Sequence, residues 1–475
     1  MRYFRLTGFL LGLMGSFLPE AHAENSMTLE QAWVLAYQDN PSLEAERARL
    51  RALDEKVAQA SSHWRPSISL NGGVGRNWQH LSSDSNNFVP TSDFARNGDT
   101  YGAQFKQPLF RGFQTLSETE EAEKQVLAGR ARLQSTEQQL LLDAGKAFLD
   151  TLRDEEVLQI YRDEEIILQK KVEETTVRAK IGDLSQTDVR QAQTRLSKAE
   201  VTRQQAEITF ASDRASFARL VGAEPEKLSV PQLAITKGQN IGDILQAADT
   251  VNPSVVSAQY IMEAAKADID LNKGSLLPEI DLVGTSSNAY GQNATYPGRS
   301  ITNQVMVQAT WQLYDGGSSY SKIREARQTV TQHRMELEDA RHKSHEMGQN
   351  AWQALQSAEA SIKSDQEEVT AAAEAAQGVR AEAHVGSRTT LDVLNAEQEL
   401  LDAKVDLAKA THDRDYAVLE IKSTMGELTA DKLKLQLEPY NPEKHYSANK
   451  GKLIGLGDDD DYVVSDKNKL TGKNN

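Results

Sequence analysis

Apolar and polar residues alternate along residues 301–315, where one side carries Val305, Val307, Ala309, Trp311 and Leu313. A period of two predicts a β-strand with one apolar face. Similar but weaker patterns lead us to expect four strands, at residues 66–78, 100–112, 278–290 and 301–315. Each is long enough for a tilted membrane strand of about 9–11 residues. Aromatic residues lie near the predicted strand ends, as in the girdle of a membrane barrel: Trp64, Tyr101, Phe110, Trp311 and Tyr314. A pair of soluble β-hairpins is the alternative.

Two long segments contain no proline, residues 109–224 and 298–438. Proline inside a helix costs about 3 kcal/mol, so its absence permits very long helices. We expect helices at residues 113–181, 187–221, 316–383 and 390–425. The first would be roughly 100 Å long at about 1.5 Å per residue, which suits a rod or a tube better than a compact domain.

The last of these helices carries two apolar seams at steps of three and four. The first seam is Leu391, Leu394, Gln398, Leu401, Val405 and Ala408, and the second is Val393, Ala396, Leu400, Ala403 and Leu407. At about 100° per residue they lie on roughly opposite sides of the helix. A helix in the wall of a tube needs one seam for each neighbour, so the pattern favours a tube.

The chain is an internal duplication. The run NPSLEAERARL at residue 40 reappears as NPSVVSAQYIM at residue 252, an offset of 212, and Gly182, Asp188 and Gly222 have counterparts 204 residues later. The offset changes by eight between the two predicted strands, so we expect a longer loop in the first copy, because loops tolerate insertions. We predict repeats at residues 24–240 and 241–439, followed by a disordered acidic and polar tail at 440–475.

Composition narrows the function. Arg2 and Arg5 precede an apolar stretch that ends in Ala-His-Ala, so residues 1–23 read as a signal peptide for export. The chain has no cysteine and a net charge of −16, which argues against thiolate chemistry and against nucleic-acid binding. No catalytic or phosphate-binding motif is present, and His342 and His345 lack further ligands. We therefore expect that the protein is not an enzyme and that it has no cofactor and no metal site.

Taken together, the paired Gly turns, the two Asn-Pro helix starts and the strand-to-helix junctions PLFRG and QLYDGG resemble the TolC-type outer membrane channel family, over about residues 27–430. The resemblance implies a mainly α-helical chain in a homotrimer. Four strands from each chain would close a twelve-stranded membrane β-barrel, and the helices would form a coiled-coil tunnel through the periplasm. Closure with other copies would also pair the strand edges that one chain leaves open.

By the same resemblance, the two Gly turns are the tips at the periplasmic entrance, and a polar latch holds them closed. Arg388 takes the place of the latch arginine, with Thr187 and Asp188 as its partners. Asp392 and Asn395 fall on the aperture positions, one helical turn apart. The family's second aperture aspartate is Asn395 here and its latch tyrosine is Ala383, so we expect a weaker latch and a less acidic entrance. An ordinary surface ion pair between Arg388 and Asp392 is the simpler interpretation.

The resemblance implies a passive exit duct of a tripartite system for type I protein secretion or multidrug efflux, located in the outer membrane. A periplasmic adaptor and an inner-membrane transporter, driven by ATP or protons, would dock at the tips, for which we single out Lys180, Gly182, His384 and Gly386. Lipid and the exported protein or small molecule are the other expected partners. A soluble periplasmic coiled-coil adaptor or scaffold is the alternative.

Overall fold

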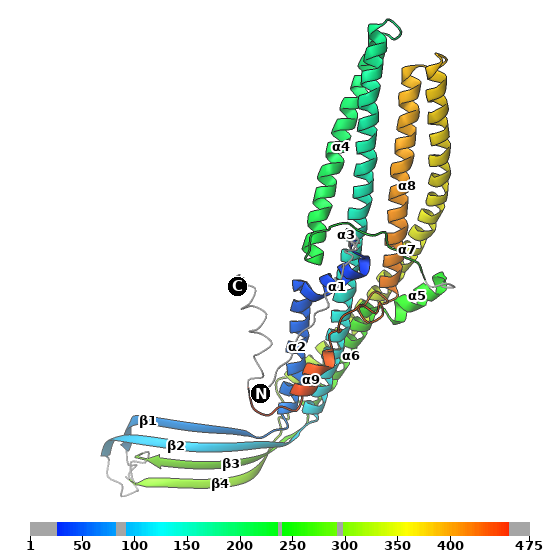
Figure 1. The fold of residues 1–475 in the computed structure, drawn as a ribbon. Helices are drawn as coiled ribbons and strands as arrows, with labels where there is room; N and C mark the ends of the chain where they lie inside the picture. The colour runs from blue at the N-terminus through cyan, green and yellow to red at the C-terminus, as the bar shows by residue number, and fades with distance from the viewer. Residues whose placement is uncertain (1–25, 82–91, 236–239, 292–297, 456–475) are drawn as a thin grey trace, which may run out of the picture.

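The computed structural model describes residues 26–81, 92–235, 240–291 and 298–455. The molecule is elongated, with a β-sheet at one end and two long helical hairpins at the other (Figure 1). The predicted signal peptide, residues 1–23, lies outside the described residues.

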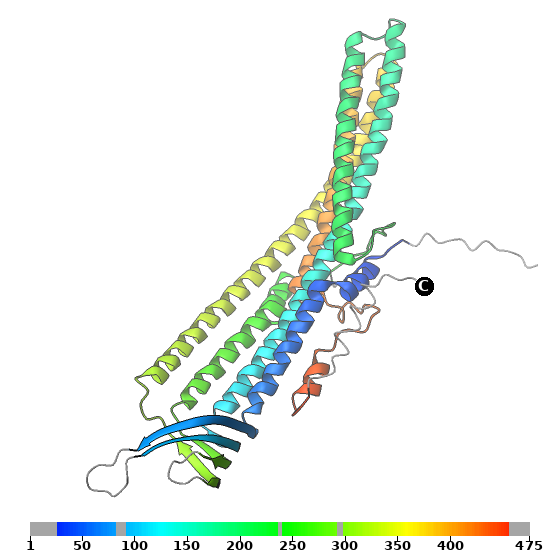
Figure 2. The same ribbon diagram turned by 90° about the vertical axis from the view of Figure 1, so that its left-hand side faces the viewer.

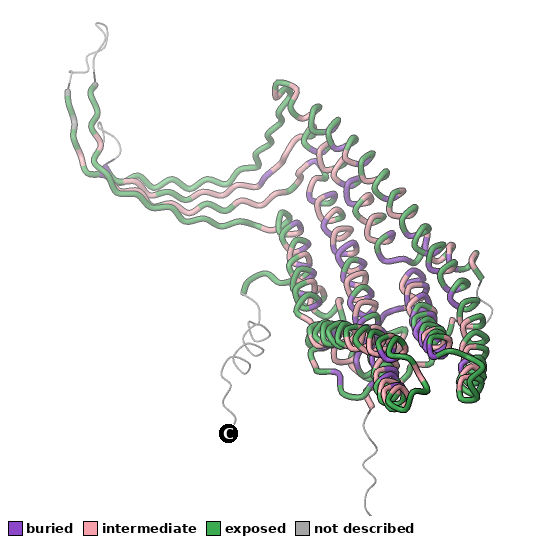
Figure 3. Tube along the Cα trace, turned by 90° about the horizontal axis from the view of Figure 1, so that it is seen from above, coloured by how far each residue is buried: buried purple, intermediate pink, exposed green. Residues whose placement is uncertain are grey.

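The sheet has four antiparallel strands in the order β1-β2-β3-β4. They are β1 Ser67–Leu81, β2 Ser92–Arg111, β3 Glu279–Tyr290 and β4 Arg299–Thr310. Most of the sheet is exposed on both faces, as Figure 3 shows. Apolar side chains share this exposure: Ile68 is 74% exposed and Val305 is 78% exposed.

Three details of the strands differ from the expectation. β4 ends at Thr310 rather than 315, because Trp311 donates to the Leu276 carbonyl at 3.1 Å and Asp315 caps the following helix. Tyr101 lies in the middle of β2, opposite Gly72, because β2 begins at Ser92. The insertion in the first copy mainly lengthens β1 and β2, which have 15 and 20 residues against 12 each in β3 and β4.

Two helical hairpins extend away from the sheet, as the proline-free segments predict. They are α3 Gln114–Lys180 with α4 Gln186–Val221, and α7 Ser318–His384 with α8 Thr390–Thr424. α3 and α7 have 67 residues each, which corresponds to about 100 Å of helix. The duplication is therefore visible in matched hairpins of nearly equal length.

Shorter helices complete the half of the molecule nearest the sheet. They are α1 Leu29–Asp39, α2 Pro41–Ser62, α5 Ile241–Thr250 and α6 Pro253–Gly274. The two Asn-Pro sequences begin α2 and α6: Asn40 and Asn252 accept backbone N–H bonds as N-caps, and proline fits the first helical position. Beside the sheet the helices lie in the order α2, α3, α6, α7 (Figure 2). Further away, α4 and α8 take the places of α2 and α6, so the helical wall continues to the tips.

The two seams of α8 explain how this wall holds together. Leu394, Gln398 and Leu401 of the first seam line a small cavity with α3 and α4 residues. Val393, Ala396 and Ala403 of the second seam are also buried. Both seams are thus covered by neighbouring helices, as expected for a helix inside a wall.

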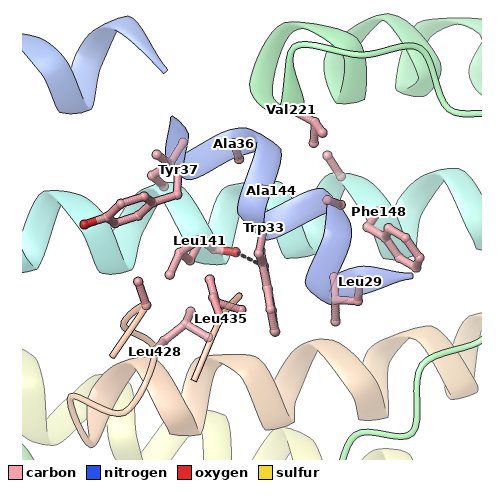
Figure 4. Packing of buried hydrophobic residues seen from close by; sticks show 14 of the residues in the cluster. Leu29, Trp33, Ala36, Tyr37, Leu141, Ala144, Phe148, Val221, Leu428 and Leu435 are labelled. Atoms are coloured by element: carbon pink, nitrogen blue, oxygen red, sulfur yellow. Dashed lines mark hydrogen bonds between the residues drawn. The ribbon is translucent and has the colours of Figure 1, made fainter. Parts of the chain in front are cut away.

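The main apolar core lies where the shorter helices cross the long ones. Trp33 of α1 is buried and donates from Nε1 to the Leu141 carbonyl of α3 at 2.8 Å (Figure 4). Phe148 and Phe217 are fully buried beside it, with ring centroids 6.3 Å apart. This core fixes α1 and the end of α4 to the middle of α3.

The expectation of a wholly disordered tail is wrong for its first part. Pro442–Asn449 form helix α9, which packs on α2. The buried Arg47 guanidinium lies between the Tyr37 and Tyr440 rings, with centroids at 4.6 and 5.2 Å, and His445 bonds Asp54 at 3.0 Å. These contacts offset the conformational entropy that the segment loses when it becomes ordered. The composition alone does not show them. Residues 456–475 of the predicted tail lie outside the described residues.

Candidate functional site

The two Gly turns end the hairpins at the pole furthest from the sheet (Figure 1). Gly182 has φ +83° and Gly386 φ +82°, in the left-handed region that glycine enters without a Cβ penalty. Each turn repeats two backbone bonds: in the second, Gly386 N–H donates to Ala383 at 3.2 Å and Ser387 N–H to Glu382 at 2.9 Å. This Schellman pattern closes the helix and reverses the chain within a few residues.

Each returning helix begins with a capping box. Ser185 and Asp188 exchange side chain-to-backbone bonds at the start of α4, and Thr389 and Asp392 do the same at the start of α8. The bonds from Thr389 lower the pKa of Asp392 below its ordinary value. Asp392 is therefore ionised at neutral pH.

Within the chain, Arg388 pairs with a residue of its own turn. Its Nε donates to Glu382 at 2.8 Å, and this bond raises the pKa of the guanidinium. The bonds found among the described residues do not join Arg388 to Thr187 or Asp188: Asp188 caps α4, and Thr187 lines a shallow cavity with Leu391 of α8. A latch through Arg388 between neighbouring copies stays a prediction.

A contact that the sequence did not suggest joins the two hairpins instead. Arg195 of α4 donates from Nη2 to the Asn395 Oδ1 atom of α8 at 2.9 Å. Asn395, expected at the aperture, thus ties α8 to α4 in the single chain. The two residues lie 200 positions apart, and the repeat does not relate them, so only the tertiary structure shows the pair.

The extreme ends of the hairpins are open to solvent. Lys180 and His384 end α3 and α7 as exposed residues, and an added Cβ at Gly182 or Gly386 would meet nothing within 4 Å. Ile181 and Val385 next to them are exposed apolar side chains. Each tip therefore offers a cation, or a potential one, beside an exposed aliphatic residue.

Other chemistry is sparse in the described ranges. His342, His345 and Glu346 lie exposed along α7, and no group of three or more potential metal-ligating side chains gathers among the residues that the structure describes. No helix within those same ranges combines the length and the apolar character needed to cross a membrane.

Comparison with known proteins agrees with this geometry. The family model described as "Outer membrane efflux protein" matches residues 33–223 and 244–427. The chain is 32% identical over 444 residues to the outer membrane efflux protein BepC of Brucella suis, covering 94% of this chain and 95% of that protein. It is 24% identical over 432 residues to the outer membrane protein TolC of Vibrio cholerae, covering 89% and 95%.

The fold also matches a solved structure. The Campylobacter jejuni CmeC outer membrane channel aligns with a TM-score of 0.76 at 13% identity, over 90% of each chain. The alternative of a periplasmic adaptor or scaffold is not supported. The chain belongs to the outer membrane efflux protein family, with the fold of TolC-type channels.

Proposed function

We propose that three copies of this chain form a passive channel-tunnel. The unpaired edges of the sheet are the main observation in support. Among the residues that the structure describes, β1 and β4 lie at the two ends of the strand order, so each has one unpaired side. Backbone groups left unpaired in lipid cost several kcal/mol each. Pairing β4 of one copy with β1 of the next satisfies both edges and closes a twelve-stranded barrel.

The exposed apolar side chains of the strands fit the same assembly. Ile68, Leu70, Val74, Ile301, Val305 and Val307 are exposed in the single chain. On the outside of a membrane barrel these side chains face lipid and gain from the contact. The helical wall then continues the barrel as a tunnel into the periplasm.

The tips form the gate in this proposal. Arg388 is 51% exposed and free to exchange Glu382 for acceptors on a neighbouring copy. Asp188 uses Oδ2 in its capping box, which leaves Oδ1 to accept from Arg388. Three copies of Asp392 make a ring of carboxylates at the aperture.

The channel does no chemistry and uses no energy itself. A periplasmic adaptor and an inner-membrane transporter, driven by ATP or protons, dock on the tips around Lys180, Gly182, His384 and Gly386 and widen the gate. The cargo is a small toxic molecule, as the efflux name of the Brucella relative suggests, or a secreted protein.

A cysteine scan across the free edges tests the assembly. The chain contains no cysteine, so one replacement at Val74 of β1 and one at a series of β4 positions from Met306 to Gln308, the register that the β2–β3 pairing and the repeat imply, leave a single reporter pair. We expect oxidation to give a covalent trimer on a non-reducing gel for the pair in register, while either single variant stays monomeric. Only monomers across the whole series would contradict the shared barrel.

A further inference from the structure

Charged side chains gather between the hairpins, on the side of the Gly turns that faces the sheet. Arg380 of α7 donates from Nε and Nη2 to the two carboxylate oxygens of Glu397 on α8. Glu397 is 6% exposed. The bidentate pair locks these two helices together within one hairpin.

A second carboxyl group meets this pair from the other hairpin. Glu164 of α3 is 8% exposed and interacts electrostatically with both Glu397 and Arg380. Glu164 lines a cavity with Leu394 and Leu401 of α8, where the two hairpins lie side by side (Figure 1). Two buried carboxyl groups therefore lie in the field of one guanidinium, and its hydrogen bonds within the described residues go to Glu397 rather than to Glu164.

The other charged side chains nearby do not cancel the repulsion between Glu164 and Glu397. α8 adds Asp402 and Lys404, which act on Glu164 in opposite senses. α4 adds Arg195 and Lys198, which line a cavity of about 210 Å³ with Glu164, but Arg195 is committed to Asn395. Glu165 on α3 itself pairs with Arg203 of α4.

We propose that Glu164 is a proton-operated catch between the hairpins: protonated, it lets α3 pack on α8, and ionised, it repels Glu397 and loosens the contact. The role of the catch in opening the tunnel rests on the proposed function. The contact between α3 and α8 itself exists in the single chain. Glu164 and Glu397, which lie outside the Gly turns, would then help to control the entrance.

The sign of the pH effect follows from the environment of Glu164. Burial first, and the Glu397 charge next, raise the pKa of Glu164 to about 7. A raised carboxyl pKa means that the contact is fully stabilised below the ordinary value and weakens as the pH rises through about 7. Between about pH 6 and pH 8 the ratio of separated to packed hairpins should rise about tenfold.

A thiol placed between the hairpins measures the separation without requiring a conducting channel. Ala199 of α4 lines the cavity with Glu164, and Ser197 of α4 is exposed. We would measure maleimide labelling of Ala199→Cys in the purified full-length protein between about pH 6 and pH 8. Dividing by the rate for Ser197→Cys removes the intrinsic pH dependence of the thiol.

The result expected is a normalised rate that rises about tenfold in the otherwise native protein. It should stay flat and low in Glu164→Gln, and rise as in the native protein in Glu173→Gln, an exposed glutamate of the same helix. In Glu397→Gln the rise should move to lower pH, which provides a second test if Glu164→Gln fails to fold. A flat native profile, or an unchanged rise in Glu164→Gln, would overturn the catch, whatever the protein does in a bilayer.

Discussion

Glycines at left-handed positions differ in what surrounds them, and this decides the cost of replacing them. Gly182 and Gly386 stand in open space at the tips. Gly112, at the junction between β2 and α3, has φ +59°, and an added Cβ would lie 2.2 Å from the Gly274 carbonyl oxygen. All three adopt positive φ, but only Gly112 lacks room for a side chain.

We therefore expect Gly182→Ala to fold and to lose about 1–2 kcal/mol, the strain of a left-handed alanine. Gly112→Ala should lose clearly more, because backbone must move as well. Melting of the helical circular dichroism signal compares the two variants under the same conditions. Equal melting temperatures would show that the close approach at Gly112 is not a constraint.

The sequence predicted these turns because a local signal encodes them. A Gly turn followed by a capping residue and an aspartate three positions later occurs twice at the same spacing, with Ser185 and Asp188 repeated as Thr389 and Asp392. The bond between Arg195 and Asn395 has no such signal, because it depends on how two hairpins pack. Sequence therefore identified the ends of the hairpins but not the contact between them.

At the scale of elements, helix α9 is held by few but specific contacts. Tyr440 covers one face of the buried Arg47 guanidinium, and Tyr446 covers Arg130. Lys450 at the end of α9 bonds Glu123 of α3 at 2.7 Å. The composition of this segment predicts disorder, and these aromatic and charged pairs overcome it.

Removing one side of the Arg47 sandwich should loosen α9. We expect Tyr440→Ala to speed tryptic cleavage after Lys444 and Lys450 by up to about thirtyfold, because a desolvated cation–π contact is worth up to about 2 kcal/mol. Tyr314→Ala, an exposed tyrosine beside the sheet, is the matched control. Equal cleavage rates in the two variants would mean that other contacts hold α9.

The long helices and the strands followed from simple periodicity. The proline-free segments predicted the long helices α3 and α7. The two apolar seams of α8 predicted that it has a neighbouring helix on each side. The end of β4 was missed because Asp315 caps α7 and Trp311 turns back to Leu276, contacts that alternation does not show. Strand ends thus depended on side-chain bonds rather than on the apolar pattern.

At the scale of the whole molecule, threefold symmetry would multiply each residue of the tips. Three Asp392 carboxylates would form an anionic ring, whereas Asn395 adds no charge. In the single chain the bonds from Thr389 lower the pKa of Asp392, while repulsion among three carboxylates in a ring would raise it, so the ring is charged at neutral pH. The ring should therefore bind multivalent cations at neutral pH.

We expect a trivalent cation to block conductance in the native protein at neutral pH. Asp392→Asn should weaken the block at least about tenfold, and Asn395→Asp should strengthen it, because charge at the ring sets the affinity. Titration of the cation against bilayer current gives the comparison. A block of unchanged strength in Asp392→Asn would place the cation site elsewhere.

Single-channel conductance of the purified protein in a planar bilayer would show whether the chain forms a channel that Arg388 holds closed. The comparison is between native protein, Arg388→Ala, and Arg178→Ala as control, since Arg178 forms a matching bond with Asp183 beside the first turn at 2.7 Å. We expect a small, stable conductance in the native protein, a larger one in Arg388→Ala and no change in Arg178→Ala. A protein that conducts nothing in any of the three forms would contradict the channel, and equal conductance in all three would contradict the latch.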